Sequence, residues 1–269
     1  ILVEKSGPLH GSVTVSGAKN SALKLMAACL LAPGTFTLRN VPVIADVKWM
    51  AELLEHMGAS ISFNKNELTI NVPETLIPEA PYELVERMRA SIVVLGPLLA
   101  RFGTARVSVP GGDDFGHRPI DMHLRGLEEL GAEFTTSHGY IQATSAGLTG
   151  TRVLLEFPSV GATENLLMAA VLAEGTTIID NAAREPEISD LADFLNRMGA
   201  QISGAGRSVI TIDGVNELHP VEHTVIADRI EAATYLAALG IAGGEIEIEQ
   251  ARADHMDMMI RKLGEMGMS

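Results

Sequence analysis

A loop between Pro110 and Pro119 carries the side chains of this sequence that are best suited to proton transfer. Asp113 and Asp114 place two carboxyl groups next to each other, and Arg118 adds a cation. The loop lacks apolar periodicity, and its glycines and prolines are typical of a bounded, irregular segment. A carboxyl group acts as an acid near neutral pH only if its pKa is raised, which a neighbouring like charge favours. The cluster indicates acid–base chemistry beside an anion, and the alternative is a solvated acidic turn.

The composition is that of an ordinary globular chain. Of its 269 residues, 46% are hydrophobic and 20% are charged, which allows two domains with substantial cores. The formal net charge is -14 and the pI is about 5.0, which argues against a general nucleic-acid binder and against an anionic membrane surface as a partner. We therefore expect no nucleic-acid or membrane partner, and any anionic ligand has to be held by a local basic cluster.

The sequence gives little support for membrane insertion, disulfides, metals or cofactors. The longest uncharged apolar stretch, residues 90–100, is well short of the roughly 20 residues that a membrane span needs. No signal peptide is visible, and we expect a cytoplasmic protein with no obligatory protein partner. The single cysteine, Cys29, lies in an apolar run and is predicted to be core, so no disulfide framework is expected. Scattered histidines predict no metal site. The lack of Walker-type and G-x-G-x-x-G loops argues against a nucleotide hydrolase and against a dehydrogenase, and we expect no cofactor.

An internal repeat of about seventy residues organises the chain. An amphipathic helix that ends in glycine recurs at intervals of 73, 68 and 68 residues, at Gly58, Gly131, Gly199 and Gly267. A glycine between an apolar helix and a strand recurs at intervals of 69, 72 and 69 residues, at Gly34, Gly103, Gly175 and Gly244. Two independent markers with one period indicate repeated units, each a strand, an apolar helix, a strand, an amphipathic helix and a hairpin.

The first and third units show the expected pattern most clearly. In the first, a helix is predicted to start near Asp46 as its N-cap, and the following hairpin is predicted to turn at residues 64–66. The predicted buried stripes are Val47, Met50, Leu53, Leu54 and Met57 in the first unit and Ile188, Leu191, Phe194, Leu195 and Met198 in the third. The fourth unit has no hairpin after Gly267, and we expect this chain to be part of a longer protein.

Polar residues stand at the predicted helix starts of the units. They are Lys19 to Ser21, Arg87 and Arg89, Ser159 to Thr163, and Asp228 with Arg229. Helix N-termini carry free N–H groups and a partial positive charge, which suit phosphate and carboxylate ligands. Because equivalent ends of repeated units tend to converge, Lys19, Arg89 and Arg118 are predicted to share one cleft that binds an anionic substrate. The alternative is that each is a solvated cap.

Six motifs are informative in their order along the chain. They are Ser16 to Asn20, Met88 to Ser91, Pro110 to Gly112 with Arg118 to Asp121, Ser159 to Thr163, Asn181 to Glu187, and Asp228 to Glu231. Together they resemble the motifs of the UDP-N-acetylglucosamine enolpyruvyl transferases, a family that takes the first committed step of bacterial peptidoglycan synthesis. The likeness runs along the whole chain and covers about the first two thirds of the family's length.

The resemblance implies the α/β enolpyruvyl-transferase fold, an inside-out α/β barrel of six repeats in two domains with the active site between them. One domain is implied to be continuous over residues 20–226 and to carry the loop. The other is implied to combine residues 1–19 with residues 227–269 and with a further part of the family fold.

The resemblance also implies a reaction and its site residues. The enolpyruvyl group of phosphoenolpyruvate moves to the 3-hydroxyl of UDP-N-acetylglucosamine, and phosphate is released. Asp113 and Lys19 are the implied catalytic residues, and Asp113 is the general acid toward the methylene carbon. The implied substrate-binding residues are Lys19, Asn20, Arg89, Arg118, Pro119, Ile120, Asp121, Met122, Phe157, Pro158, Ser159 and Val160. The family's general base for the sugar hydroxyl lies beyond residue 269, so these residues alone are expected to bind nucleotide sugar without turnover.

Asp113 departs from the commoner family pattern, which has cysteine at this position. Fosfomycin alkylates that cysteine, and a carboxylate is a far poorer nucleophile than a thiolate, so Asp113 predicts insensitivity to the drug. Two other readings stay open. One is the sister transferase that acts on shikimate 3-phosphate, whose opening motif normally reads Pro-Gly-Ser-Lys-Ser, and the other is a non-catalytic paralogue that binds nucleotide sugars.

Overall fold

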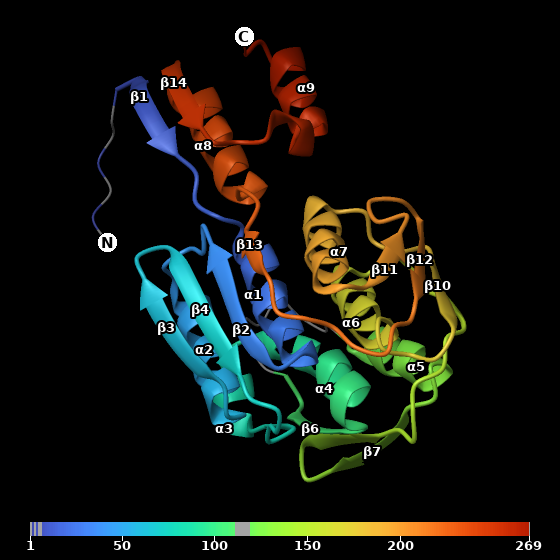
Figure 1. Cartoon of the computed structure of the whole chain (residues 1–269). Helices are drawn as coiled ribbons and strands as arrows, with labels where there is room; N and C mark the ends of the chain where they lie inside the picture. The colour runs from blue at the N-terminus through green and yellow to red at the C-terminus, as the bar shows by residue number, and fades with distance from the viewer. Residues whose placement is uncertain (1, 3, 5–6, 111–118, 269) are drawn as a thin grey trace.

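The computed structural model describes residues 2, 4, 7–110 and 119–268. Within these residues the strands form three four-stranded sheets and one two-stranded sheet (Figure 1). The first four-stranded sheet contains β2 (Gly34–Arg39), β3 (Ser60–Asn64), β4 (Glu67–Val72) and β13 (Glu222–Thr224). The second contains β5 (Glu79–Ala80), β6 (Thr104–Ser108), β7 (Glu133–Ser137) and β8 (Tyr140–Thr144). The third contains β9 (Arg152–Leu154), β10 (Thr176–Asp180), β11 (Gln201–Ser203) and β12 (Val209–Asp213).

The three larger sheets share one topology, which confirms the predicted repeat. In each, a short strand pairs in parallel with a longer strand, and the longer strand pairs antiparallel with one arm of a hairpin. The orders are β13-β2-β4-β3, β5-β6-β8-β7 and β9-β10-β12-β11. All eight marker glycines have positive φ, from 65° at Gly103 to 120° at Gly34, a region that side chains rarely allow. The period therefore marks backbone positions that favour glycine.

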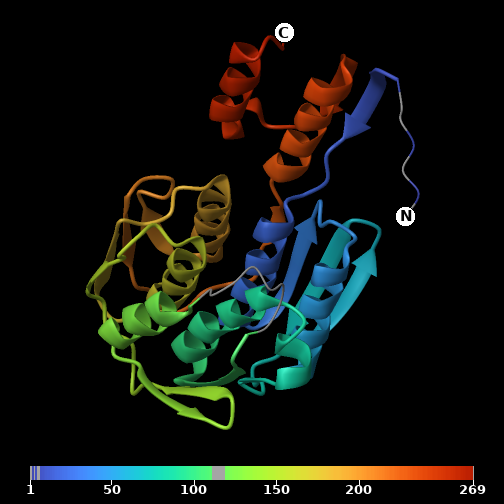
Figure 2. The same cartoon turned by 180° about the vertical axis from the view of Figure 1, so that it is seen from behind.

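Helices fill the space between the three sheets, which lie on the outside of this body (Figures 1 and 2). They are α1 (Lys19–Ala28), α2 (Ala45–His56), α3 (Tyr82–Val85), α4 (Leu95–Phe102), α5 (Asp121–Glu129), α6 (Val160–Ala170) and α7 (Pro186–Met198), with 3₁₀ helices η1 (Cys29–Leu31) and η2 (Arg89–Val94). Their apolar residues join those of the sheets in one continuous core. The predicted stripes of α2 and α7 are buried there, and so is Cys29, whose burial raises the pKa of the thiol.

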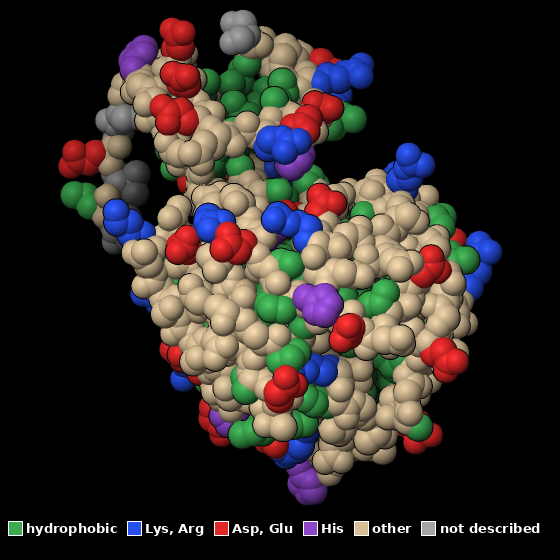
Figure 3. All heavy atoms as spheres, in the orientation of Figure 1, with side chains coloured by type: hydrophobic (Ala, Val, Ile, Leu, Met, Phe, Trp, Pro, Cys, Tyr) green, Lys and Arg blue, Asp and Glu red, His purple; other side chains and the backbone are tan. Residues whose placement is uncertain are grey.

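Residues from both ends of the chain form a smaller unit. β1 (Leu9–Thr14) pairs in parallel with β14 (Gly244–Glu249), and α8 (Arg229–Ala242) packs against β14. The short helix η3 (Ala253–His255) and α9 (Asp257–Glu265) follow. A small apolar cluster of Val15, Ala232 and Met256 lies at its centre. In Figure 3 this unit sits above the body, and the two are joined by a narrow neck.

Two chain segments run side by side through the neck. The Ala18 N–H donates to Ile226 O at 2.7 Å, and the Asp228 N–H donates to Ser16 O at 2.9 Å. The Ser16 backbone N–H and hydroxyl both donate to Glu231 Oε2, at 3.0 and 2.6 Å. These contacts fix the start of α1 against the start of α8.

The start of α2 differs from the prediction. α2 begins at Ala45 after Ile44 and has no side-chain cap, so the prediction that Asp46 is the N-cap is wrong. The Asp46 carboxylate instead lies 2.9 Å from Lys19 Nζ, a cation of a different helix that the local sequence does not reveal. The β3–β4 hairpin turns within residues 64–66, as predicted. None of the helices in the described part of the chain is long and apolar enough to cross a membrane.

Candidate active site

A cavity of about 1020 Å³ opens where helices α1, α6, α7 and α8 begin. The predicted site residues that line it are Lys19, Asn20, Arg89, Pro119, Met122, Phe157, Pro158, Ser159 and Val160. The converging helix starts therefore bring residues of three sequence units around one space. Asp113 and Arg118 lie outside the described residues.

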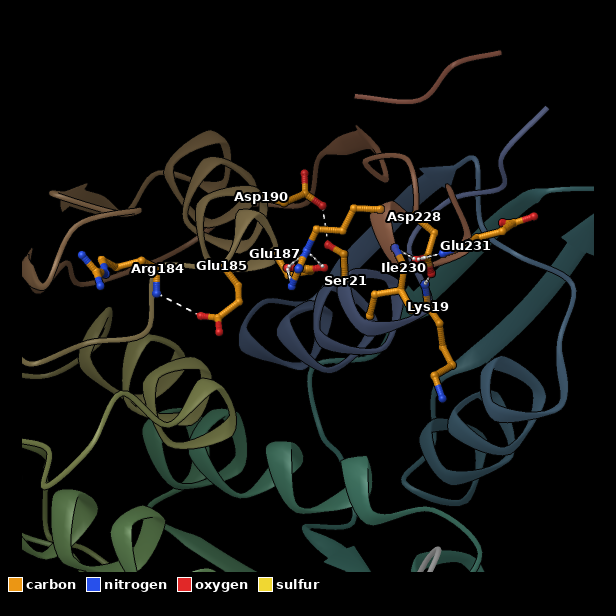
Figure 4. A network of polar contacts seen from close by, with 10 residues as sticks. Lys19, Ser21, Arg184, Glu185, Glu187, Asp190, Asp228, Ile230 and Glu231 are labelled. Atoms are coloured by element: carbon orange, nitrogen blue, oxygen red, sulfur yellow. Dashed lines mark hydrogen bonds and ion pairs between the residues drawn. The ribbon is translucent and has the colours of Figure 1, made fainter. Parts of the chain in front are cut away.

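Lys19 and Asn20 are the first two residues of α1 and are placed by the neck. The Lys19 N–H donates to Asp228 Oδ2 at 3.1 Å, which supplies the start of α1 with a carboxylate from α8's N-cap. Figure 4 shows Asp228 beside the α1 start and the Lys19 side chain turned toward α2. The Lys19 side chain is 46% exposed despite its ion pair with Asp46, so an anionic ligand can compete for the ammonium group.

Arg89 begins η2 on another wall of the cavity. It donates from Nη2 to Pro119 O at 3.1 Å, which joins this wall to the residues that follow the loop. Ile120 and Asp121 are not among the lining residues. Ile120 packs against the core, and Asp121 Oδ2 lies 3.6 Å from Arg125 Nη2 one turn along α5.

The start of α6 forms a third wall. The Ser159 hydroxyl accepts a long hydrogen bond from the Ala162 N–H at 3.4 Å, and the Thr163 hydroxyl donates to Ser159 O at 2.8 Å. The first N–H groups of this eleven-residue helix stand at the cavity, where an anion is favoured. Phe157, which is 56% exposed, adds an apolar surface beside them.

His123 lies in the same cavity, buried beside α6. Asn165 determines which ring nitrogen of His123 carries the proton. The orientation of the Asn165 amide is fixed because Oδ1 accepts from the Gly96 N–H at 2.7 Å and Nδ2 donates to Ile92 O at 3.1 Å. The other N–H of Asn165 then points to His123 Nδ1 at 3.0 Å, which makes that ring nitrogen an acceptor. Burial, together with the charge of Arg89, lowers the pKa of His123 to about 4. His123 is therefore neutral near pH 7 and carries its proton on Nε2.

Among the residues that the structure describes, the cavity is lined by five cations and five carboxylates. The lining cations are Lys19, Lys24, Arg87, Arg89 and Arg229, and the lining carboxylates are Asp46, Glu86, Glu164, Glu185 and Glu187. Arg229 contacts both oxygens of the buried Glu187, at 3.1 and 3.2 Å. Carboxylates of this kind hold flexible cations in fixed places, at the cost of attraction for a negatively charged ligand.

Lys24, His123 and Glu164 are lining residues that sequence reasoning missed. A signal was present for Lys24, a lysine inside an otherwise apolar helix and four residues after Asn20, hence on the same helix face. Glu164 likewise follows Val160 by four residues in an apolar run. In the residues that the structure describes, no group of three or more His, Cys, Asp or Glu side chains is arranged to hold a metal ion.

Comparison with known proteins assigns the family. Residues 3–269 match the EPSP synthase (3-phosphoshikimate 1-carboxyvinyltransferase) family. This chain belongs to that family. As a member of it, the chain is similar to a UDP-N-acetylglucosamine 1-carboxyvinyltransferase of Carboxydothermus hydrogenoformans, with 53% identity over 99% of this chain and 64% of the relative. The corresponding enzymes of Caldanaerobacter subterraneus subsp. tengcongensis and Myxococcus xanthus are 52% and 50% identical over the same shares.

Solved structures agree on the fold of this family member. The enolpyruvyl transferase NikO from Streptomyces tendae matches with a TM-score of 0.78 at 25% identity, over 89% of this chain and 57% of NikO. An EPSP synthase from Acinetobacter baumannii matches with a TM-score of 0.76 at 22% identity, over 97% of this chain and 60% of its own length. The predicted enolpyruvyl-transferase fold and the resemblance to the UDP-N-acetylglucosamine enzymes are thus confirmed. The chain spans 64% of the length of the curated relatives that it matches.

Proposed function

We propose that this chain contributes the substrate-binding face of an enzyme that transfers the enolpyruvyl group of phosphoenolpyruvate to the 3-hydroxyl of UDP-N-acetylglucosamine and releases phosphate. The observation that supports this most directly is the single cavity shared by Lys19, Asn20, Arg89 and the start of α6, in a chain 50 to 53% identical to enzymes named for that acceptor. The reaction serves peptidoglycan synthesis, and we propose that it takes place in the cytoplasm.

We assign the roles of the residues from the resemblance to the UDP-N-acetylglucosamine enolpyruvyl transferases. Lys19 and Asn20 hold the negatively charged phosphoenolpyruvate, with Arg118 near its charges. Arg89, residues 118–122 and residues 157–160 are the nucleotide-sugar residues in this proposal, and of the described residues 119–122 it is Pro119 and Met122 that line the cavity. The diphosphate of the sugar suits the N–H groups at the α6 start. Residues 20–226 form one domain, and residues 1–19 with 227–269 belong to a second; the two separate apolar clusters support this division.

Proton balance defines the role of Asp113 in this proposal. The methylene carbon of phosphoenolpyruvate takes a proton from the Asp113 carboxyl group as the sugar oxygen bonds to the adjacent carbon, and the sugar hydroxyl gives its own proton to the general base that the family provides beyond residue 269. The product keeps the enolpyruvyl double bond, so the new methyl group loses a proton as the bond to phosphate breaks, and the net proton from the sugar leaves with the hydrogen phosphate. Asp113 therefore has to be protonated at the start of the cycle, and a carboxyl group at its ordinary pKa of about 3.9 would not be.

Ligand binding to the 269-residue chain tests the choice of acceptor. Calorimetric titration with UDP-N-acetylglucosamine, with and without phosphoenolpyruvate, is expected to show binding that Arg89→Ala weakens by roughly tenfold or more, the effect of losing one charged hydrogen bond. Arg152→Ala is the matched control, since Arg152 is paired with Asp180 on the third sheet and does not line the cavity.

The same titration separates the alternatives. Binding of shikimate 3-phosphate in place of the nucleotide sugar would show that the chain shares the acceptor for which its family is named. Nucleotide-sugar binding by a protein that also contains the remainder of the fold, without phosphate release when phosphoenolpyruvate is added, would favour the non-catalytic paralogue.

Asp113 gives an independent test through fosfomycin. A catalytically competent protein with Asp113 is expected to keep its activity in the drug, and Asp113→Cys is expected to lose activity with time through a covalent adduct at the new thiol. Mass spectrometry of both proteins after incubation is the measurement. An adduct on the unaltered protein at Asp113 would contradict the expected insensitivity.

A further inference from the structure

Lys24 and Glu164 form a buried ion pair that lines the cavity. Their side chains are 10% and 1% exposed, and Lys24 Nζ lies 3.5 Å from Glu164 Oε2. This separation is that of an ion pair and is long for a hydrogen bond, and neither Glu164 oxygen accepts a hydrogen bond from the described residues. A fully buried carboxyl group without a hydrogen-bond donor is costly in its charged form.

The position of the pair relates it to the candidate substrate site. Lys24 follows Asn20 by four residues on α1, and Glu164 follows Val160 by four residues on α6. In each helix a spacing of four places the side chains on one face, about one turn apart. The pair therefore lies one turn deeper than the two helix starts that carry the predicted ligand-binding residues.

The surroundings of Glu164 favour its neutral, protonated form. Burial is the main reason that the pKa of Glu164 rises from 4.5 to about 7, and Lys24 opposes the rise. From the start of α7, the carboxylates of Glu187 and Glu185 also raise the pKa of Glu164. The charge of Glu187 is partly offset by Arg229 of α8, with which it pairs.

The other polar groups described around α6 have hydrogen-bond partners of their own. On α5, His123 is neutral near pH 7 and accepts from Asn165 of α6. At the start of η2, Arg89 donates to Pro119 O. Farther along α7, Asp190 accepts from the Ser21 hydroxyl and lies 2.8 Å from His223 Nε2. Figure 4 shows the contact between Ser21 and Asp190 at the α1–α7 interface. Within the described part of the chain, Lys24 is thus the cation that pairs with Glu164.

We propose that Lys24 is a ligand for the anionic donor substrate, and that Glu164 takes up a proton from solvent when the anion binds. Before an anion binds, Lys24 is the counter-ion of Glu164. An incoming phosphate or carboxylate group accepts hydrogen bonds from Lys24 Nζ, and Glu164 becomes a neutral carboxyl group that no longer competes for it. The inference rests on the proposed function only for the identity of the anion.

The proposal predicts how the affinity for the anion changes with pH. At low pH Glu164 is already neutral, Lys24 is available, and anion affinity is highest. As pH rises above about 7, binding has to be accompanied by proton uptake, so affinity falls by up to about tenfold per pH unit. A pair that serves only to tie α1 to α6 would show no such coupling.

Proton uptake on binding is the decisive measurement. Titration of the 269-residue chain at pH 8 with phosphoenolpyruvate and with sulfate, in two buffers of different ionisation enthalpy, gives the protons taken up per anion. Sulfate has no titratable proton at this pH, so its uptake belongs to the protein. We expect uptake approaching one proton in the unaltered chain and near zero in Glu164→Gln, which binds the anion with little dependence on pH.

Matched variants separate this role from a structural one. Glu86→Gln removes an exposed carboxylate that also lines the cavity and is expected to keep the proton uptake. Lys24→Met combined with Glu164→Gln leaves a neutral pair and is expected to lose roughly tenfold or more in anion affinity, as for one charged hydrogen bond. Binding without proton uptake, uptake retained in Glu164→Gln, or unchanged affinity in the double variant would each overturn the proposal. Failure of UDP-N-acetylglucosamine to bind while anion-linked uptake persists would overturn only the proposed acceptor.

Discussion

Helices α6 and α8 are both rich in apolar residues and yet differ completely in burial. Every residue of α6 from Ala162 to Ala170 is buried, whereas Ala232 is the one buried residue of the fourteen in α8. α6 is packed by α4, α5, α7 and β10, while α8 has its main contact with β14. Within this chain, which spans 64% of its relatives' length, apolar composition states what a helix is able to bury, and the number of neighbouring elements present in the chain decides what it does bury.

The difference in burial between α6 and α8 also determines the partners of their polar residues. In α6, the enclosed Thr163, Glu164 and Asn165 each have a specific environment: a backbone partner in Ala183, an ion pair with Lys24, or the bond to His123. In α8, the exposed Thr234 only donates to Ile230 O of its own helix. Buried polar groups constrain one arrangement because an unpaired one is costly, and exposed groups exchange partners with water.

The largest expected effect tests the difference in burial between α6 and α8 through unfolding free energy. Leu166→Ala in α6 removes a fully buried side chain and is expected to cost about 2–5 kcal/mol of unfolding free energy. Ile241→Ala in α8 is the matched change, at a side chain that is 91% exposed, and should alter stability by no more than about 0.5 kcal/mol. Urea unfolding of both variants is the measurement. Equal costs would show that α8 is enclosed in solution to the same degree as α6.

A titration of His123 is expected to have the next largest effect. The ordinary pKa of 6.5 falls to about 4 in the folded chain, so the unfolded chain binds the proton first as pH decreases. The stabilisation is complete above pH 6.5, is lost between pH 6.5 and 4, and amounts to about 3 kcal/mol. Glu164 acts in the opposite sense. Its raised pKa stabilises the folded state fully below pH 4.5, and this stabilisation is lost as the pH rises to about 7.

The difference between variants isolates His123 from Glu164. Unfolding free energies of the unaltered chain and of His123→Asn, measured from pH 4 to pH 8, share the Glu164 contribution, so their difference reports the histidine. As the pH falls below 6.5, we expect the unfolding free energy of the unaltered chain to decrease relative to that of His123→Asn. A difference that stays constant over the range would contradict a neutral, buried His123.

Ion pairs sharpen the comparison at a smaller scale. Arg229→Met leaves Glu187, whose side chain is 3% exposed, without its cation, and is expected to cost about 1–3 kcal/mol. Arg252→Met breaks a pair with Asp254 on the surface of the smaller unit, where both side chains are more than half exposed, and should cost at most about 1 kcal/mol. Thermal unfolding of both variants tests the ranking, which a larger loss in Arg252→Met would reverse.

Sequence patterns predicted the parts of this molecule that repeat. Gly103 and Gly199 end their helices in the left-handed region, and the period of such glycines gave the units correctly. The apolar stripes of α2 and α7 were also predicted, because a helix period of 3.6 depends on local sequence alone. Lys19, Arg89 and Arg118 were expected in one cleft; Lys19 and Arg89 line the cavity, and Arg118 lies outside the described residues.

Pairings between distant helices were not predictable in the same way. Asp46 was assigned to cap its own helix, since nothing in its neighbourhood indicates that Lys19 lies beside it. Glu164 and Lys24 are 140 residues apart, and either could have been a solvated side chain on the outer face of a helix. Their pairing depends on how α1 packs near α6, which is a property of the assembled repeats.

The smallest expected effect concerns Asp228, which joins the start of α8 to the start of α1. Its Oδ1 accepts from the Ile230 and Glu231 N–H groups and caps α8, while Oδ2 accepts from the Lys19 N–H at the start of α1. Asp228→Ala removes both contacts and is expected to cost about 1 kcal/mol or slightly more, the usual value for a lost N-cap. Asp228→Asn keeps one acceptor oxygen, so it can still cap α8 but cannot accept from Lys19 as well. Urea unfolding should therefore rank Asp228→Asn between Asp228→Ala and the unaltered chain, and hydrogen exchange should show faster exchange at the Lys19 amide in both variants. An Asn variant as destabilised as the Ala variant would mean that the carboxylate charge, and not its hydrogen-bond geometry, secures the joined helix starts.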